Sequence, residues 1–214
     1  MPLLPDHLKI TDIPKMENAE VADLMARFEP LVKHFNRYLT IGGFPELALS
    51  DDDLYAQRML REDVVDKVIK RDVLTLFKVR SPLLMEKLFL YLCMNSTEIF
   101  SATTAAKELD NISPNTIESY VDALVKSNLI YMAYPIAVGS KSVLKGRPKI
   151  YIADAAIRNA VLMVDDVLSD ERELGLLIET TVYKHLVSFY QGTGAQLGYY
   201  RKAKENQKEV DAVI

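Results

Sequence analysis

The chain has 214 residues, of which 49% are hydrophobic and 26% are charged, and its formal net charge is −4. This length allows one large or two small domains, and the composition is that of an ordinary globular protein. The negative balance argues against a protein that coats nucleic acid with its whole surface. Its apolar runs, such as 88–94, are far shorter than the ~20 residues that a membrane-spanning helix needs.

The first residues show no charged segment followed by an apolar one, which predicts that the chain is not secreted. The single cysteine, Cys93, lies within an apolar run and has no Cys or His neighbour at metal-ligand spacing. We therefore expect a buried thiol, a cytoplasmic location and no membrane contact.

Helical spacing dominates the first 98 residues. Apolar side chains recur every three or four residues across 19–39, and a turn rich in glycine at 42–45 then ends that helix. Three aspartates at 51–53 supply the cap and the first-turn charges of a second helix, which we expect to run to about Ile69.

A third helix is predicted to begin at Ser81 and Pro82, because serine caps a helix and proline suits its first position. We expect this helix to end near Asn95. The segment 1–98 is therefore predicted to be an all-helical bundle.

The next segment, 99–155, has the layout of a winged helix-turn-helix. In order, it predicts a helix at 101–109, a turn at 110–112, a helix capped by Ser113, a strand at 129–133, a basic wing at 139–148 and a strand at 149–152. This layout can place its second helix in the major groove of DNA. The same layout is also used for contacts between proteins. It therefore predicts the fold of this segment more firmly than the kind of partner that the segment binds.

The predicted DNA contacts come from the polar face of the second helix and from the wing. These residues are Asn115, Thr116, Ser119, Lys126, Lys141, Lys145, Arg147 and Lys149. From 101 to 150 the chain has six basic and four acidic residues, and two of the acids, Glu118 and Asp122, lie on that same polar face. Carboxylates facing phosphates weaken DNA binding, so a wing that touches no partner is the alternative interpretation.

The remaining segment, 156–214, is predicted to mix helices and strands. Asp154 caps a short helix that ends at 162, an acidic linker spans 165–173, and an amphipathic helix spans 174–190. Strand-like runs follow at 196–201 and 209–214. Because an unpaired apolar strand edge invites aggregation, we expect this sheet to continue in a longer protein.

Several segments, in this order, resemble one known family. They are 35–45, 120–124, 147–154, 175–179, 199–201 and 209–211. The family is a group of uncharacterised prokaryotic AAA-type ATPases, in which a P-loop domain precedes a helical lid, a winged helix and a nuclease-like C-terminal domain. The resemblance runs from about Ala19 to Ile214 and implies that this chain is the part that follows the P-loop core.

The P-loop itself is absent from the sequence. That motif requires G-x-x-x-x-G-K-[ST], and the nearest match, Gly139–Ser142, has serine in place of the second glycine and lies in the predicted wing. We therefore expect this chain alone to bind no cofactor and to hydrolyse no ATP. The resemblance implies ATP, and Mg²⁺ as a further candidate, in the parent protein.

The turn at Gly43 and Pro45 resembles the turn that related ATPases place against the adenine of bound nucleotide. The resemblance implies that both residues contact the base in the parent protein. A helix C-cap is the alternative, because glycine permits a left-handed backbone and proline prevents the helix from continuing. Both interpretations can hold together.

Glu179 on a helix and Asp211 on a strand resemble the first two acids of a PD-(D/E)xK nuclease core. In that core, acids hold Mg²⁺, which activates water and stabilises the leaving oxygen. The lysine that completes the motif would have to follow Ile214, because Glu205–Lys208 has the wrong spacing and precedes Asp211. The sequence therefore predicts half of a metal site.

Together these features predict a mainly α protein of the α+β class, with a helical lid bundle, a winged helix-turn-helix and a partial α/β nuclease-like domain. The leading hypothesis is a non-catalytic region of an AAA-type ATPase whose winged helix contacts double-stranded DNA, a protein, or the ATPase core in cis. The alternatives are a stand-alone winged-helix DNA-binding regulator and part of a Mg²⁺-dependent nuclease.

Overall fold

A computed structural model describes residue 12 and residues 15–77, 79–136, 146–164, 166–201 and 209–214. The chain forms two compact units, Met1–Tyr38 and Leu39–Ile214. The described part of the first unit is almost entirely helix α1 (Asn18–Ile41), which continues into the second unit. An ion pair between Asp23 and Arg27, four residues apart, lies on its exposed surface.

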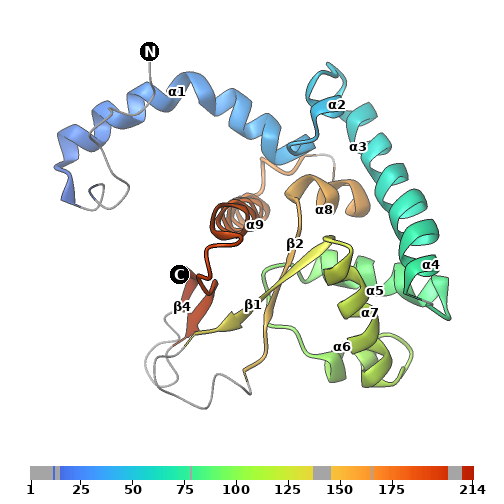
Figure 1. Cartoon of the computed structure of the whole chain (residues 1–214). Helices are drawn as coiled ribbons and strands as arrows, with labels where there is room; N and C mark the ends of the chain where they lie inside the picture. The colour runs from blue at the N-terminus through green and yellow to red at the C-terminus, as the bar shows by residue number, and fades with distance from the viewer. Residues whose placement is uncertain (1–11, 13–14, 78, 137–145, 165, 202–208) are drawn as a thin grey trace. The chain divides into compact units, whose positions relative to one another are not determined.

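Helices form the first part of the second unit (Figure 1). They are α2 (Pro45–Ala48), α3 (Asp53–Arg61), the π-helical segment η2 (Glu62–Val73), α4 (Leu74–Leu76) and α5 (Pro82–Met94). The predicted caps are confirmed, because Asp52 accepts a hydrogen bond from the backbone of Tyr55 and Ser81 accepts one from Leu84. The helix expected to end near Ile69 instead continues through η2 and α4.

The segment predicted as a winged helix-turn-helix forms two helices and two strands in the expected order. They are α6 (Ala102–Glu108), α7 (Pro114–Lys126), β1 (Ile130–Pro135) and β2 (Lys149–Ile152). The strands are antiparallel, with Ile130 opposite Ile152 and Ala133 opposite Lys149. Ser113 precedes α7 as expected, but its side chain makes no capping hydrogen bond.

The last part of the chain consists of two helices and two strands. They are α8 (Ala155–Leu162), α9 (Glu171–Tyr190), β3 (Gly198–Arg201) and β4 (Glu209–Val213). Asp154 caps α8, as predicted. Helix α9 begins three residues earlier than expected, because Asp170 accepts hydrogen bonds from the backbone of Arg172 and Glu173 and so caps the helix within the presumed linker.

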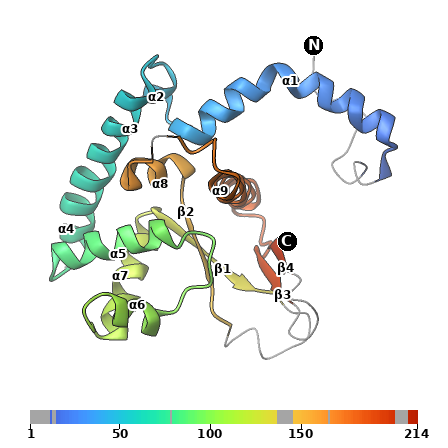
Figure 2. The ribbon, with the colours of Figure 1, turned by 180° about the vertical axis from the view of Figure 1, so that it is seen from behind.

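All four strands belong to one sheet, in the order β2-β1-β3-β4. Strand β1 pairs in parallel with β3, which in turn pairs antiparallel with β4. Figure 2 shows the antiparallel pair β1 and β2 beside the antiparallel pair β3 and β4, seen from behind. Strands from the predicted segments 99–155 and 156–214 thus belong to the same sheet. The result is a mixed α/β architecture in which helices predominate.

The main hydrophobic core lies between the helices and one face of β1 and β2. Its fully buried members include Met85, Leu88, Leu124, Ile130 and Ile150. The predicted burial of Cys93 is confirmed, since its side chain is inaccessible and burial raises the pKa of its thiol. No helix within the described ranges is both long enough and apolar enough to cross a membrane.

Buried polar groups anchor α8 in this core. The guanidinium of Arg158 makes a bidentate ion pair with Glu173, at 2.6 and 3.2 Å, and donates to the backbone carbonyl of Cys93. The amide of Asn159 donates to the carbonyl of Leu39 at 3.0 Å. The guanidinium of Arg158 and the amide nitrogen of Asn159 are thereby compensated inside the protein, whereas the buried Oδ1 of Asn159 has no hydrogen-bond partner among the described residues.

Within the turn that follows α1, Gly42 adopts a left-handed backbone conformation, with φ of +77°. An added Cβ would lie 2.7 Å from Oδ1 of Asp154 and 2.9 Å from Cβ of Ala156. We expect Gly42→Ala to lower the free energy of unfolding by about 3 kcal/mol, from backbone strain and steric overlap together. Urea denaturation followed by circular dichroism measures this loss.

Gly192→Ala is the matched control, because Gly192 has nearly the same φ, +79°, but open space around the position of a Cβ. Backbone strain alone should cost this variant about 1 kcal/mol. Equal losses in the two variants would show that the contact of Gly42 with α8 has no energetic weight.

Candidate functional site

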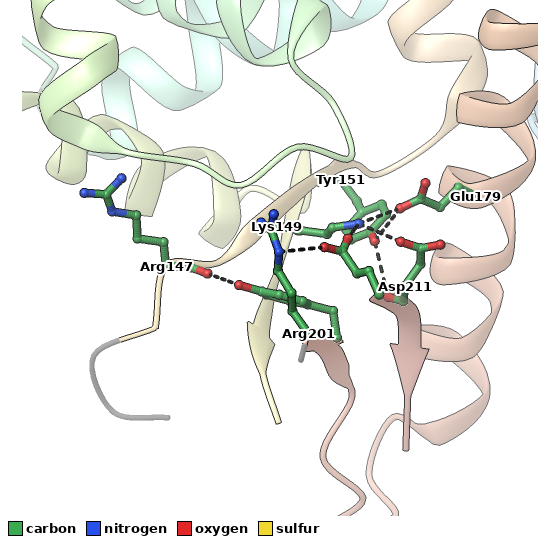
Figure 3. A network of polar contacts seen from close by, with 8 residues as sticks. Arg147, Lys149, Tyr151, Glu179, Arg201 and Asp211 are labelled. Atoms are coloured by element: carbon green, nitrogen blue, oxygen red, sulfur yellow. Dashed lines mark hydrogen bonds and ion pairs between the residues drawn. The ribbon is translucent and has the colours of Figure 1, made fainter. Parts of the chain in front are cut away.

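Five polar residues from three elements meet beside the sheet (Figure 3). We call this group the acid–lysine cluster: Lys149 and Tyr151 on β2, Glu179 on α9, and Glu209 and Asp211 on β4. The structure therefore brings together Glu179 and Asp211, the two residues that the sequence predicted as a metal-binding pair.

The ammonium of Lys149 is the centre of the cluster. Its Nζ lies 2.7 Å from Oδ1 of Asp211 and 3.4 Å from Oε1 of Glu179, and it also contacts Oε1 of Glu209. Lys149 is only 5% exposed, so these carboxylates take the place of water around the charge. Its Nζ also lies 5.9 Å from the centre of the Tyr199 ring.

Tyr151 connects the cluster to the aromatic side chains beneath it. Its hydroxyl donates a hydrogen bond to Oε1 of Glu179 at 2.8 Å. Its ring stacks on Tyr183, with centres 4.0 Å apart and planes within 7°. The hydroxyl of Tyr199 donates to the backbone carbonyl of Arg147 at 2.8 Å. Aromatic contacts thus hold the end of β2 against α9 and β3.

Local periodicity places each of these side chains. Alternate residues of a strand face opposite sides, so Lys149 and Tyr151 share the face toward α9 while Ile150 enters the main core. The same alternation puts Glu209 and Asp211 on one face of β4. On α9, Glu179 and Tyr183 are four residues apart and therefore lie on the same side of the helix.

Burial disfavours the charged forms of Lys149, Glu179 and Tyr151, and the cluster has more carboxylates than ammonium groups. Burial lowers the pKa of Lys149, but the hydrogen bonds to Asp211 and Glu209 and the charge of Glu179 outweigh it, so the net pKa is raised. Burial raises the pKa of Glu179 in spite of Tyr151 and Lys149. Burial, followed by the charge of Glu179, also raises the pKa of Tyr151. The lysine is therefore held charged and the tyrosine protonated near neutral pH.

The cluster in this arrangement does not fit a Mg²⁺ ion. Magnesium requires oxygen ligands at about 2.0–2.1 Å with near-octahedral geometry. The space between Glu179 and Asp211 is filled by the ammonium of Lys149. Within the described part of the chain, no group of three or more His, Cys, Asp or Glu side chains could hold a metal ion. The half-site predicted from sequence is thus occupied by an internal cation.

The predicted DNA-binding residues lie in different environments. Asn115 and Ser119 are exposed on α7, Thr116 is half-buried, and Arg147 is exposed next to β2. Lys126 is exposed but pairs with Asp122 at 2.6 Å. Lys141 and Lys145, with most of the predicted wing, lie outside the described residues.

Lys149 differs most from its expected place on the wing. Its position in β2 turns the side chain toward α9, where the carboxylates already satisfy its charge. Its ammonium is therefore not presented to a phosphate group.

A groove with a volume of about 870 Å³ runs beside α7 and β1. Its apolar lining includes Val121, Val125 and Met132, and Glu118 and Asp122 also line it. The approach to β2 contributes Arg147, and α9 contributes Tyr183 and Val187. The groove therefore combines an apolar lining with acidic side chains from α7.

Both residues of the predicted nucleotide-contacting turn are exposed. Gly43 follows the left-handed Gly42, and Pro45 is the first residue of α2. The C-cap conformation thus belongs to Gly42, one residue before the glycine named in the alternative interpretation. Gly43 and Pro45 are therefore not covered by the described part of this chain.

Sequence reasoning did not single out Tyr151, Tyr183 or Glu209 as site residues. A local signal was present for each. Glu209 is two residues from Asp211 on its strand, Tyr151 is two residues from Lys149, and Tyr183 is four residues from Glu179 on α9, so each shares a face with a predicted site residue. The pairing of Lys149 with acids 30 and 62 residues away has no such local signal.

The chain belongs to the family described as a domain of unknown function, DUF8612, which matches residues 32–168. It is similar to two uncharacterised proteins of Methanocaldococcus jannaschii. It is 30% identical to MJ1637 over 80% of this chain and 36% of that protein, and 24% identical to MJ1544 over 84% of this chain and 40% of that protein. No solved structure shows a significant match. The chain therefore spans less than half the length of these relatives.

Replacing the central cation tests the energetic role of the cluster. In Lys149→Met, three carboxylates remain close together without the central ammonium, and among the described residues only Glu209 keeps a second ion pair, with Arg201 at 3.7 Å. We expect the free energy of unfolding to fall by about 3 kcal/mol, near the lower end for a broken buried pair because Asp211 is half exposed. Chemical denaturation at neutral pH measures the change.

Lys126→Met removes the same charge from an exposed helical pair and should cost no more than about 0.5 kcal/mol. A Lys149→Met protein as stable as this control would contradict the proposed role of the buried lysine.

The raised pKa of Glu179 predicts a pH dependence of stability. The folded state binds this proton more tightly than the unfolded chain, whose glutamate titrates near pH 4.3. The resulting stabilisation is lost as pH rises through the raised pKa. We therefore expect Glu179→Gln, which cannot titrate, to gain stability relative to the wild type between about pH 4 and pH 7. Urea denaturation across this range would disprove the assignment if the difference stayed constant or reversed.

Proposed function

We propose that this chain is an interaction region of a larger AAA-type ATP-binding protein and that its winged helix binds a protein, foremost the ATPase core of the same polypeptide. The apolar groove with acidic groups beside α7 is the observation that carries this proposal. Apolar surface of this kind is typical of a site that another protein covers.

The order of elements supports the winged-helix part of the proposal. Helices α6 and α7 precede an antiparallel pair of strands, and the polar face of α7 is exposed at the position of a recognition helix. The nuclease-like part rests on the helix–strand arrangement of α9, β3 and β4 and on the meeting of Glu179 with Asp211.

Two observations support the larger protein. The matched relatives are more than twice as long as the part that aligns with this chain. The ordered segments resemble the region that follows the P-loop core in AAA-type ATPases. ATP, and Mg²⁺ with it, would then belong to that core, and the exposed Gly43 and Pro45 would contact the adenine in the assembled protein.

The charges favour a protein over double-stranded DNA as the partner of the winged helix. Proteins that bind DNA strongly neutralise several phosphates at once. Among the basic residues predicted to contact DNA and lying within the described residues, Lys126 is paired with an acid and Lys149 is buried. Arg147 is then the exposed cation that is not in such a pair. Glu118 and Asp122 would face the phosphates with the wrong sign.

A fluorescently labelled 20-base-pair duplex tests the DNA alternative. We expect no saturable change in anisotropy below about 10 µM protein at about 50 mM salt, and the same result for Arg147→Glu. Tight binding that weakens steeply with salt and disappears in Arg147→Glu would favour a DNA-binding regulator. Cleavage of the duplex that requires Mg²⁺ and is lost in Glu179→Gln would favour the nuclease.

The positive test compares this chain with the full-length parent protein. A cysteine introduced as Glu118→Cys lies in the groove, whereas one introduced as Lys107→Cys lies on the exposed surface of α6. We expect maleimide to label residue 118 about tenfold more slowly in the full-length protein than in this chain, with residue 107 unchanged. Equal rates at residue 118 would contradict docking of the core in this groove.

A further inference from the structure

A second, smaller cavity lies next to the groove beside α7 and β1. It has a volume of about 250 Å³, lies beside α6 and the end of α5, and has Tyr91, Glu98 and Glu108 among its lining residues. We call it the α5–α6 cavity. Like the groove, which is lined by Glu118 and Asp122, it is bordered by acidic side chains.

The groove and the α5–α6 cavity are parts of one surface, because they have lining residues in common. Phe100, Ser101 and Arg147 line both of them. A segment that lies in the groove can therefore place a side chain in the α5–α6 cavity without leaving this surface.

The charges of this surface are unbalanced. Its lining contains one cation, Arg147, and four carboxylates, which belong to Glu98, Glu108, Glu118 and Asp122. Asp122 is paired with Lys126, but the three glutamates form no ion pair with another described residue. Figure 3 shows the side chain of Arg147 pointing away from the acid–lysine cluster. The described residues thus leave an excess of negative charge around both hollows.

The α5–α6 cavity offers more to a cation than its carboxylates. The pKa of Tyr91 is raised, first by burial and then by the charges of Glu108 and Glu98, so its hydroxyl stays protonated. Two aromatic residues, Tyr91 and Phe100, line the cavity, and aromatic rings attract cations. A lysine or arginine side chain matches this combination of carboxylates and aromatic residues.

The groove adds an apolar requirement to this preference for cations. Val121, Val125 and Met132 line it, and Glu118 and Asp122 alternate with the two valines along α7. An occupant that is only basic would leave the apolar lining in contact with water, and one that is only apolar would leave the carboxylates without a counter-charge.

We propose that the occupant of the groove is a segment with an apolar face flanked by lysine or arginine side chains, one of which enters the α5–α6 cavity beside Glu98 and Glu108. This inference rests on the proposed function, because it names the chemistry of the core surface that the groove receives. Charge complementarity then selects the segment that docks, and the apolar contacts hold it there.

The full-length parent protein tests docking and charge separately. Thr103 is exposed and lines the groove, so the rate at which maleimide labels Thr103→Cys reports coverage of the groove without a change of charge. We expect this rate to be about tenfold lower in the full-length protein than in this chain alone. Adding Glu98→Lys and Glu118→Lys should restore the rate to within about twofold of that of this chain, because like charges across a contact repel.

Glu29→Lys with Glu62→Lys is the matched control, because both glutamates are exposed and line neither hollow. This control should keep the slow rate. A second measurement needs no charge reversal: raising the salt from about 50 mM to about 500 mM should speed labelling of Thr103→Cys severalfold in the full-length protein, since salt screens exposed charges. Circular dichroism checks that all variants remain folded.

The possible results separate this inference from the proposed function. Equal labelling rates at residue 103 in the full-length protein and in this chain would contradict docking itself, and this inference with it. Slow labelling that persists after charge reversal and at high salt would overturn the basic segment as the occupant, while docking of the core would stand.

Discussion

The interaction on which much of this structure depends is the burial of one ammonium among three carboxylates. Lys149 belongs to a strand whose other face enters the main core, so its position along the chain cannot shift by one residue without exposing that core. The carboxylates come from α9 and β4, which are far away in the sequence. Lys149 therefore connects strand β2 to helix α9 and strand β4.

This tie has consequences for both chemistries that the sequence suggests. The ammonium of Lys149 lies between Glu179 and Asp211, in the place where the sequence predicted a divalent cation, and offsets part of their negative charge. The same lysine is withdrawn from the wing, which weakens the case for a phosphate-binding surface. One buried charge thus both pairs with the two predicted metal ligands and accounts for one of the predicted DNA contacts.

The helices around the sheet divide their faces between these roles. Helix α9 supplies Glu179 and Tyr183 to the acid–lysine cluster and leaves Val182 and Phe189 exposed. Helix α7 buries Ile117 and Leu124 and leaves acids beside a groove. In both cases the buried face is specified by packing, and the exposed face carries the residues that are free to meet a partner.

The sequence by itself determined what depends on neighbours along the chain. The caps at Asp52, Ser81 and Asp154, the order of α6, α7, β1 and β2, and the burial of Cys93 follow from local hydrogen bonds and from hydrophobic periodicity. Only the tertiary structure decided that β1 and β2 share a sheet with β3 and β4 and that Lys149 faces the predicted acids. The reason is physical: the pairing of β1 with β3, between residues 64 positions apart, and the ion pairs of Lys149, 30 and 62 positions apart, are selected by the packing of the whole unit, and no local pattern encodes them.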